Sequence, residues 1–150
     1  MGIETHWVTG LGYEGETIDG LIATLEGWGI FTLVDVRLNA ISRKRGFSKT
    51  ALSQALTESG ITYLHRPVLG NPKENRADYS EPHSVTGNAA REHFRLILTT
   101  AEADLAIDEI AALTANGRVA VMCFERSQLH CHRQQIIEAA LRKLDSPVAA

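Results

Sequence analysis

The chain has 150 residues, a length typical of one folded domain whose core needs no disulfide or metal to support it. Its composition, 44% hydrophobic and 22% charged, is that of an ordinary globular protein, and its net charge of −3 argues against a uniformly basic nucleic-acid-binding protein. No apolar stretch is long enough to cross a bilayer, and the start of the chain lacks the pattern of a secretory signal. Two cysteines in a chain without such a signal indicate a reducing compartment, so we expect a cytoplasmic protein. We also expect that it does not associate with membranes.

Short apolar runs alternate with helical patterns along the chain. β-branched and apolar runs predict strands over residues 6–11, 31–36, 61–65 and 119–124. Apolar residues at helical spacing predict a helix between Thr17, its N-cap, and Gly29, and a second between Ser48 and Gly60. We expect a polar loop from Gly70 to about Thr86. Further helical patterns cover residues 94–98, 105–113 and 136–144.

This alternation predicts a single α/β domain over residues 1–150. We expect a mostly parallel sheet of four or five strands with helices on both faces, a Rossmann-like three-layer fold. Because parallel strands end at one edge, where such sheets bind ligands, the segments that follow the strands should surround one site. These segments are residues 12–15, 37–49, 66–76 and 123–133.

The segment after the second strand, RLNAISRKRGFSK, is strongly basic. Residues 37–49 contain five cationic side chains and no acid. The guanidinium groups of Arg37, Arg43 and Arg45 suit phosphate or carboxylate, and a helix that starts at Ser48 would add free backbone N–H groups. The segment therefore favours anion binding, and the alternative is a solubilising loop.

The segment CFERSQLHCHR, residues 123–133, holds both cysteines of the chain. Cys131 lies near the start of the last helix, where the helix dipole and Arg133 would lower the pKa of its thiol. Cys131 is therefore a candidate nucleophile, with His132 or Glu125 as the proton carrier. Cys123 is favoured as a small core residue.

Two other chemistries of this segment stay open. A metal site is conceivable, but the spacing of the ligand types matches neither a zinc finger nor a zinc ribbon, and we assign no metal and no cofactor. A redox disulfide would require the two Cα atoms to approach, which spacing cannot establish, and the pattern is not C-x-x-C. The residues concerned are Cys123, Glu125, His130, Cys131 and His132.

Polar residues at the other strand ends complete the predicted site. Asp35 either acts as a general base or pairs with a cation such as Arg37. His65 ends the third strand at the same edge, where it either contacts a ligand or packs. Tyr13 and Glu14 lie in a glycine-flanked turn after the first strand, where Tyr13 could line the pocket.

Four motifs together resemble the DUF488 family: TGLGYEG, LVDVR followed by SRKRGFSK, GITYLHRPVLGNPKENR, and VMCFERSQLHCHR. The resemblance covers roughly residues 8–142 and implies one α/β domain with a parallel sheet, but no activity. This chain departs from the family at Ala40, where many relatives have proline, and at residues 127–130, where relatives often have an Asp/Ser-Pro turn; His130 is therefore not expected to act family-wide. The recurrent polar residues of the family fall at Tyr13, Glu14, Asp35, Arg37, Ser42, Arg43, Cys123, Glu125, Cys131, His132 and Arg133.

Our leading hypothesis is an enzyme that acts on a phosphate-bearing or nucleotide-like ligand. The alternatives are a nucleic-acid-binding module without catalysis, in which Phe47 or Tyr79 would stack on bases, and a purely structural polar network. The candidate catalytic residues are Cys131, His132, Glu125 and Asp35. The candidate ligand-binding residues are Tyr13, Glu14, Arg37, Ser42, Arg43, Arg45, His65 and Arg133.

Overall fold

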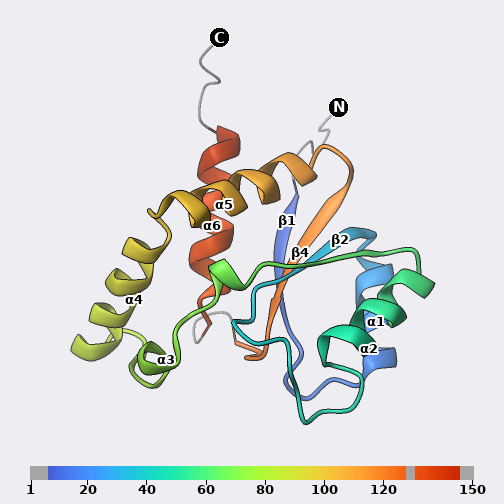
Figure 1. Cartoon of the computed structure of the whole chain (residues 1–150), viewed down its shortest axis with the longest axis horizontal. Helices are drawn as coiled ribbons and strands as arrows, with labels where there is room; N and C mark the ends of the chain where they lie inside the picture. The colour runs from blue at the N-terminus through green and yellow to red at the C-terminus, as the bar shows by residue number, and fades with distance from the viewer. Residues whose placement is uncertain (1–6, 128–130, 146–150) are drawn as a thin grey trace.

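The structure is a computed structural model that describes residues 7–127 and 131–145. Its strands are β1 (Val8–Gly12), β2 (Ile30–Asp35), β3 (Thr62–His65) and β4 (Arg118–Cys123). Its helices are α1 (Ile18–Gly27), α2 (Lys49–Glu58), α3 (Lys73–Tyr79), α4 (Val85–Ile97), α5 (Ala101–Leu113) and α6 (Arg133–Asp145), with a short 3-10 helix, η1, at Pro67–Leu69. Figure 1 shows their arrangement.

The strands form one parallel sheet in the order β1-β4-β2-β3. The last strand of the sequence, β4, is inserted between β1 and β2, so the direction of strand order changes beside it. Ligands bind at such points in open α/β sheets, just beyond the carboxyl ends of the strands. The predicted parallel α/β fold is confirmed.

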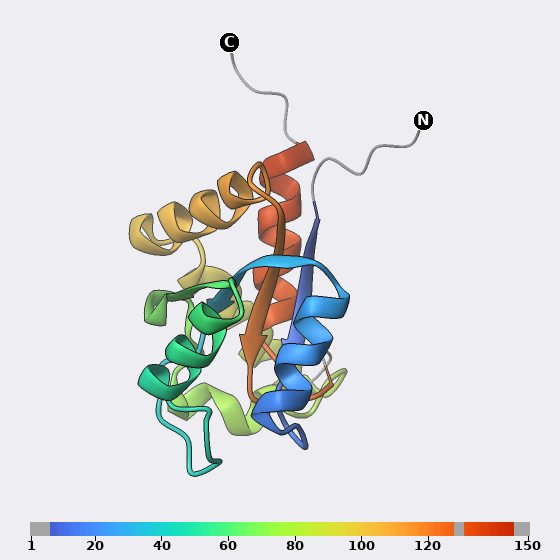
Figure 2. The same ribbon diagram turned by 90° about the vertical axis from the view of Figure 1, so that its right-hand side faces the viewer.

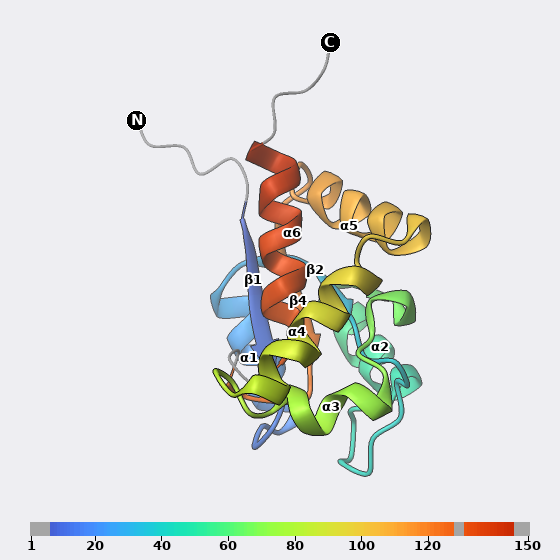
Figure 3. The ribbon, with the colours of Figure 1, turned by 90° about the vertical axis from the view of Figure 1, so that its left-hand side faces the viewer.

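Helices cover both faces of the sheet. Helices α1 and α2 lie on one face, and α5 and α6 lie on the other, with α3 and α4 packed together beside them (Figures 1, 2 and 3). The alternation of side chains along β4 separates two buried clusters. Val119 and Val121 pack with α5 and α6, whereas Ala120 and Met122 pack with α1 and α2. The central strand is therefore apolar on both sides, as its sequence indicates.

Local signals for the first helix act as predicted. The Thr17 side chain accepts a hydrogen bond from the Gly20 N–H at 3.0 Å, and Gly29 has a positive φ of 68° directly after the helix. Ser48 is the N-cap residue of α2 by position, but its hydroxyl bonds Ser42 instead of the helix backbone.

The prediction of a polar loop from Gly70 to about Thr86 is wrong over part of its length. Residues Lys73–Tyr79 form α3, which follows Pro72. Only Asn75 and Tyr79 of this helix are buried, and Asn75 is polar. The helix therefore lacks the apolar residues at helical spacing from which a helix is predicted. The helix is held by tertiary packing against α4.

None of the helices in the described part of the chain is long and apolar enough to cross a membrane. Strand β1 begins, and α6 ends, at the end of the molecule opposite the carboxyl edge of the sheet (Figures 1 and 3). The carboxyl edge is therefore surrounded by loops and helix starts.

Candidate functional site

A cavity of about 320 Å³ opens at the carboxyl edge of the sheet, a volume suited to a small ligand. The segments that follow all four strands contribute to its lining. Of the predicted residues, Tyr13, Arg37, Glu125 and His132 line it, as does Cys123.

Asp35 and Arg37 form a buried ion pair beneath this cavity. The Arg37 Nε and Nη2 donate to the Asp35 carboxylate at 2.9 and 2.7 Å, and Tyr63 adds a hydrogen bond to that carboxylate at 2.5 Å. The Arg37 Nη1 donates to the Tyr13 hydroxyl at 3.3 Å and to the Phe47 carbonyl at 2.6 Å. Burial alone would lower the pKa of Arg37, but the hydrogen bonds and charge of Asp35 raise it, so the guanidinium stays charged. The pair holds the loop after β2 in place.

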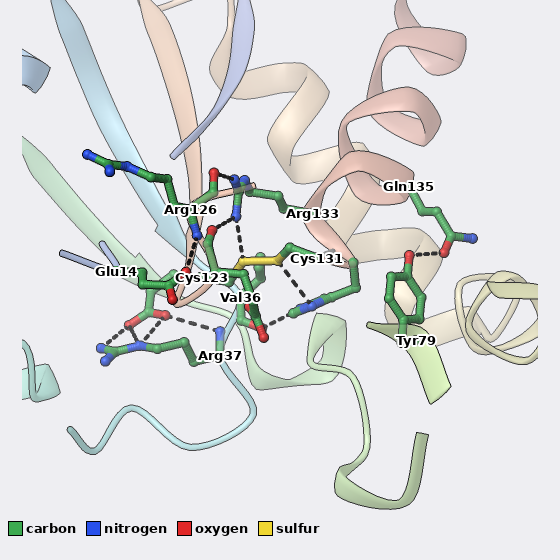
Figure 4. Close-up of a disulfide and its surroundings, with 12 residues drawn as sticks. Glu14, Val36, Arg37, Tyr79, Cys123, Arg126, Cys131, Arg133 and Gln135 are labelled. Atoms are coloured by element: carbon green, nitrogen blue, oxygen red, sulfur yellow. Dashed lines mark hydrogen bonds and ion pairs between the residues drawn. A yellow bond between two sulfur atoms is a disulfide. The ribbon is translucent and has the colours of Figure 1, made fainter. Parts of the chain in front are cut away.

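Arg133 braces the loop after β4 from inside the protein. Its side chain is only 2% exposed, and Nη1 donates to the Cys123 sulfur at 3.0 Å and to the Glu125 carbonyl. Nη2 donates to the Arg126 carbonyl at 2.7 Å, while the Glu14 carboxylate accepts from the Arg126 N–H at 3.0 Å (Figure 4). Arg133 and Glu14 therefore shape the wall of the cavity from behind it.

The two cysteines are joined by a disulfide in this structure. Cys123 ends β4 and Cys131 lies two residues before α6, and their sulfur atoms are bonded (Figure 4). The sequence did not favour this pairing, because a separation of eight residues does not determine whether the two Cα atoms come close enough for a disulfide. In the bonded form Cys131 has no thiol, so any nucleophilic role would require reduction.

His132 is buried next to the disulfide. Its Nε2 donates to the Val36 carbonyl at 3.1 Å, which leaves Nδ1 as an acceptor, 3.6 Å from the Cys131 sulfur. Burial lowers the pKa of His132 to about 4, and the positive charges of Arg76 and Arg133 act in the same direction. The ring is therefore neutral at pH 7.

The cavity is also lined by Asn71, Arg76 and Tyr79, which are not among the candidate site residues. Asn71 and Arg76 belong to segment 66–76, which was expected at this edge, and Tyr79 was expected to stack on bases only in the nucleic-acid-binding alternative. Arg76 donates through Nε to the Asn71 carbonyl at 3.0 Å, and its side chain is otherwise exposed. Burial raises the pKa of Tyr79 to about 12, and its hydroxyl donates to Gln135 of α6. Pro72 followed by the acidic Glu74 was the available signal for a helix that would present Arg76.

The basic loop after β2 divides between the interior and the surface. Arg37 turns inward, but Arg43 and Arg45 are exposed and do not line the cavity. Ser42 braces the loop, since its N–H donates to the Ser48 hydroxyl at 2.9 Å. His65 donates to the Arg37 carbonyl at 2.7 Å and lines a separate hollow.

Three side chains within the described ranges could together hold a metal ion if the disulfide were reduced. Cys123, Cys131 and His132 each place a ligand atom within 4.8 Å of the others, and all three are buried. His130, a further ligand type in the sequence, lies outside the described residues.

No curated protein and no solved structure matches this chain. The family model described as domain of unknown function DUF488 matches residues 17–140, which include most of the strands and all of the cavity residues except Tyr13. The chain therefore belongs to the DUF488 family.

Proposed function

We propose that the protein is an enzyme that acts on a phosphate-bearing or nucleotide-like ligand in the cavity at the carboxyl edge of the sheet. The observation that carries the proposal is the position of Arg76. Its guanidinium lines the cavity, and only Nε is bonded among the described residues, so two terminal nitrogens are available to a ligand. A planar guanidinium suits phosphate oxygens, and Asn71 lines the same cavity.

The proposed anion contact moves from the loop after β2 to α3. Arg37 is committed to Asp35, Tyr13 and Phe47, so neither its charge nor its hydrogen-bond donors are free for a ligand. Arg43 and Arg45 lie outside the lining. Arg76 therefore replaces them as the main candidate for binding the anion.

The rest of the lining suits a ligand with a flat apolar part. Phe124 is 46% exposed and meets the Tyr13 ring edge-on, with 5.3 Å between ring centroids. An exposed aromatic ring beside a cation is the combination that binds a base and its phosphate. Leu38 and Ile41 add apolar surface to the same cavity.

Glu125 is the proposed proton carrier. Its carboxylate lines the cavity and is half-buried, whereas the Asp35 carboxylate is fully buried and already accepts hydrogen bonds from Arg37 and Tyr63. Asp35 therefore positions Arg37 instead of exchanging protons with a ligand. The neutral Nδ1 of His132 is a second acceptor.

The test is calorimetric titration with inorganic phosphate, a nucleoside monophosphate and the same nucleoside without phosphate. We expect saturable binding of the phosphate-bearing probes, weakened by Arg76→Ala by roughly 10- to 100-fold, as loss of a charge-assisted hydrogen bond predicts. Lys73→Ala, which removes the same charge from the exposed first turn of α3, should bind like the wild type. Absence of binding, or equal binding by Arg76→Ala, contradicts the proposal.

A nucleic-acid-binding module is the second candidate. Arg43 and Arg45 are exposed, and their loop, residues 37–49, contains no acidic residue that could pair with them. Against it, Phe47 and Tyr79 are buried and stack on protein groups, so neither offers a face to a base. Titration with single-stranded DNA over a salt series separates the two. A steep salt dependence abolished by Arg43→Ala with Arg45→Ala would favour the module.

A further inference from the structure

The disulfide and His132 lie together at the wall of the cavity. Their side chains are of the types that bind metal ions, which is a different chemistry from anion binding. Cys123 and His132 both line the cavity, while Cys131 lies directly behind them, 1% exposed. Two sulfurs and one imidazole nitrogen within 4.8 Å are the ligand set of a soft or borderline divalent cation.

We propose that, in the reduced protein, Cys123, Cys131 and His132 bind one divalent cation of the zinc class, with the fourth coordination position open toward the cavity. Three protein ligands and one open position are the arrangement of catalytic zinc sites, and two cysteines with one histidine are among the known sets. The disulfide form is then the oxidised, metal-free state of the same site.

The partners of the ligands support a metal-binding role. The Val36 carbonyl accepts the Nε2–H of His132, so the Nδ1 lone pair is directed toward the Cys131 sulfur. Metal-bound histidines almost always donate their second N–H in this way, because it fixes the tautomer and the ring orientation. The Arg133 Nη1 donates to the Cys123 sulfur at 3.0 Å, which would stabilise a thiolate.

The separation of the two cysteines leaves room for an ion. Their Cα atoms lie 7.3 Å apart, which is wider than the range of about 4.4–6.8 Å common in disulfides. Two Zn–S bonds of about 2.3 Å at a tetrahedral angle would hold the sulfurs about 3.8 Å apart. The Cα separation is therefore compatible with an ion between the sulfurs once the bond is reduced and the side chains turn apart.

The disulfide must be reduced before the ion can bind. A phosphine reductant breaks the S–S bond, takes up an oxygen atom from water to become the phosphine oxide, and leaves one proton on each thiol. Binding of the cation then displaces both thiol protons. In a cell, a dithiol reductant would take the place of the phosphine and would itself become a disulfide.

The experiment is cobalt titration of the full chain, reduced with a phosphine and transferred into chelator-free buffer without oxygen. We expect one equivalent of Co²⁺ to produce a thiolate-to-metal charge-transfer band and the d–d bands of a tetrahedral site, and one equivalent of Zn²⁺ to displace it. This wild-type spectrum reports sulfur ligation without any variant. A reduced protein with two reactive thiols and no such bands overturns the proposal.

Variants assign the ligands. Cys123→Ser, Cys131→Ser and His132→Gln should each weaken Co²⁺ binding by more than the roughly 10- to 100-fold that loss of an outer partner costs. His93→Gln, on the exposed face of α4, should bind like the wild type. Unchanged affinity in the two serine variants would contradict the assignment. Arg76→Ala should keep the metal and lose the phosphate ligand, so failure of the anion proposal is distinguishable from failure of this one.

Discussion

Asp35 shows how fully a buried carboxylate is used at this sheet edge. It is completely buried, pairs with the Arg37 guanidinium through two parallel hydrogen bonds, and also accepts hydrogen bonds from the Arg37 backbone N–H and the Tyr63 hydroxyl. A buried pair of this kind is costly to break from one side, because the other charge stays behind without a partner. Asp35 therefore has a structural role in the polar network: it keeps Arg37 in position at the site.

Asp35→Asn should lower the free energy of unfolding by about 3–5 kcal/mol, because Arg37 would keep its charge without a carboxylate partner. Urea unfolding monitored by far-UV circular dichroism measures the change. Glu92→Gln is the matched control, since Glu92 pairs with Arg95 on the exposed surface of α4 and its loss should cost less than about 1 kcal/mol. Equal losses in the two variants would refute the structural role of Asp35.

His132 makes stability depend on pH. Its pKa in the folded protein, about 4, lies below the ordinary value of 6.5, because the buried ring is costly to charge and faces Arg76 and Arg133. Between these two pH values the unfolded chain binds more protons than the folded one, so stability falls as the pH drops. The contribution of His132 is complete above pH 6.5 and lost toward pH 4.

In the disulfide-bonded, metal-free protein, this effect should be on the order of 3 kcal/mol between neutral and acid pH. The contribution of His132 is isolated by measuring the free energy of unfolding from pH 7 to pH 4 for the wild type and for His132→Gln. The carboxylates titrate in both proteins, so their effect cancels in the difference. We expect the difference between the two proteins to shrink as the pH falls. A constant difference across this range would show that His132 titrates normally.

At the scale of elements, the ends of β1 and β4 stay paired beyond the last residues of the strands. The Tyr13 N–H donates to the Cys123 carbonyl at 3.2 Å and the Glu14 N–H donates to the Phe124 carbonyl at 2.8 Å. Gly12 permits this approach, because a Cβ placed there would lie 1.7 Å from the Glu125 carbonyl oxygen. The close passage positions Phe124 and Glu125 at the cavity.

Gly12→Ala should therefore destabilise the protein by about 1–3 kcal/mol and weaken ligand binding, since the backbone at Glu125 must move. Thermal unfolding and the nucleotide titration measure the two effects. Gly27→Ala is the control: nothing lies within 4 Å of its Cβ position at the end of α1, and alanine should change stability by less than about 1 kcal/mol. A neutral Gly12→Ala would mean that the two strand ends are not tightly held.

At the scale of the whole molecule, the site is built at one end of the sheet and the described chain ends at the other (Figure 1). The insertion of β4 between β1 and β2 brings three strand ends together, and α3 adds Arg76 and Tyr79 to the lining of the cavity. The charge of the basic loop after β2 is divided: Arg37 is neutralised inside by Asp35, whereas Arg43 and Arg45 face solvent.

Much of the fold could be predicted from local pattern. Apolar runs such as residues 119–124 lie within a residue of the observed strand β4, and Thr17 and Gly29 bound α1 as expected. These features depend on short-range chemistry: alternation along strands, helical periodicity and capping. The helix α3 escaped prediction because packing against α4, not its own period, stabilises it.

For the site, the sequence by itself determined the edge of the sheet and most of its polar residues, because parallel strands must end together. Only the tertiary structure decided the role of each side chain. It turned Arg37 and Arg133 inward, left Arg43 and Arg45 outside the cavity, brought Arg76 in on α3, and joined Cys123 to Cys131. Side-chain direction and long-range approach are set by packing between elements distant in sequence, and no local pattern encodes them.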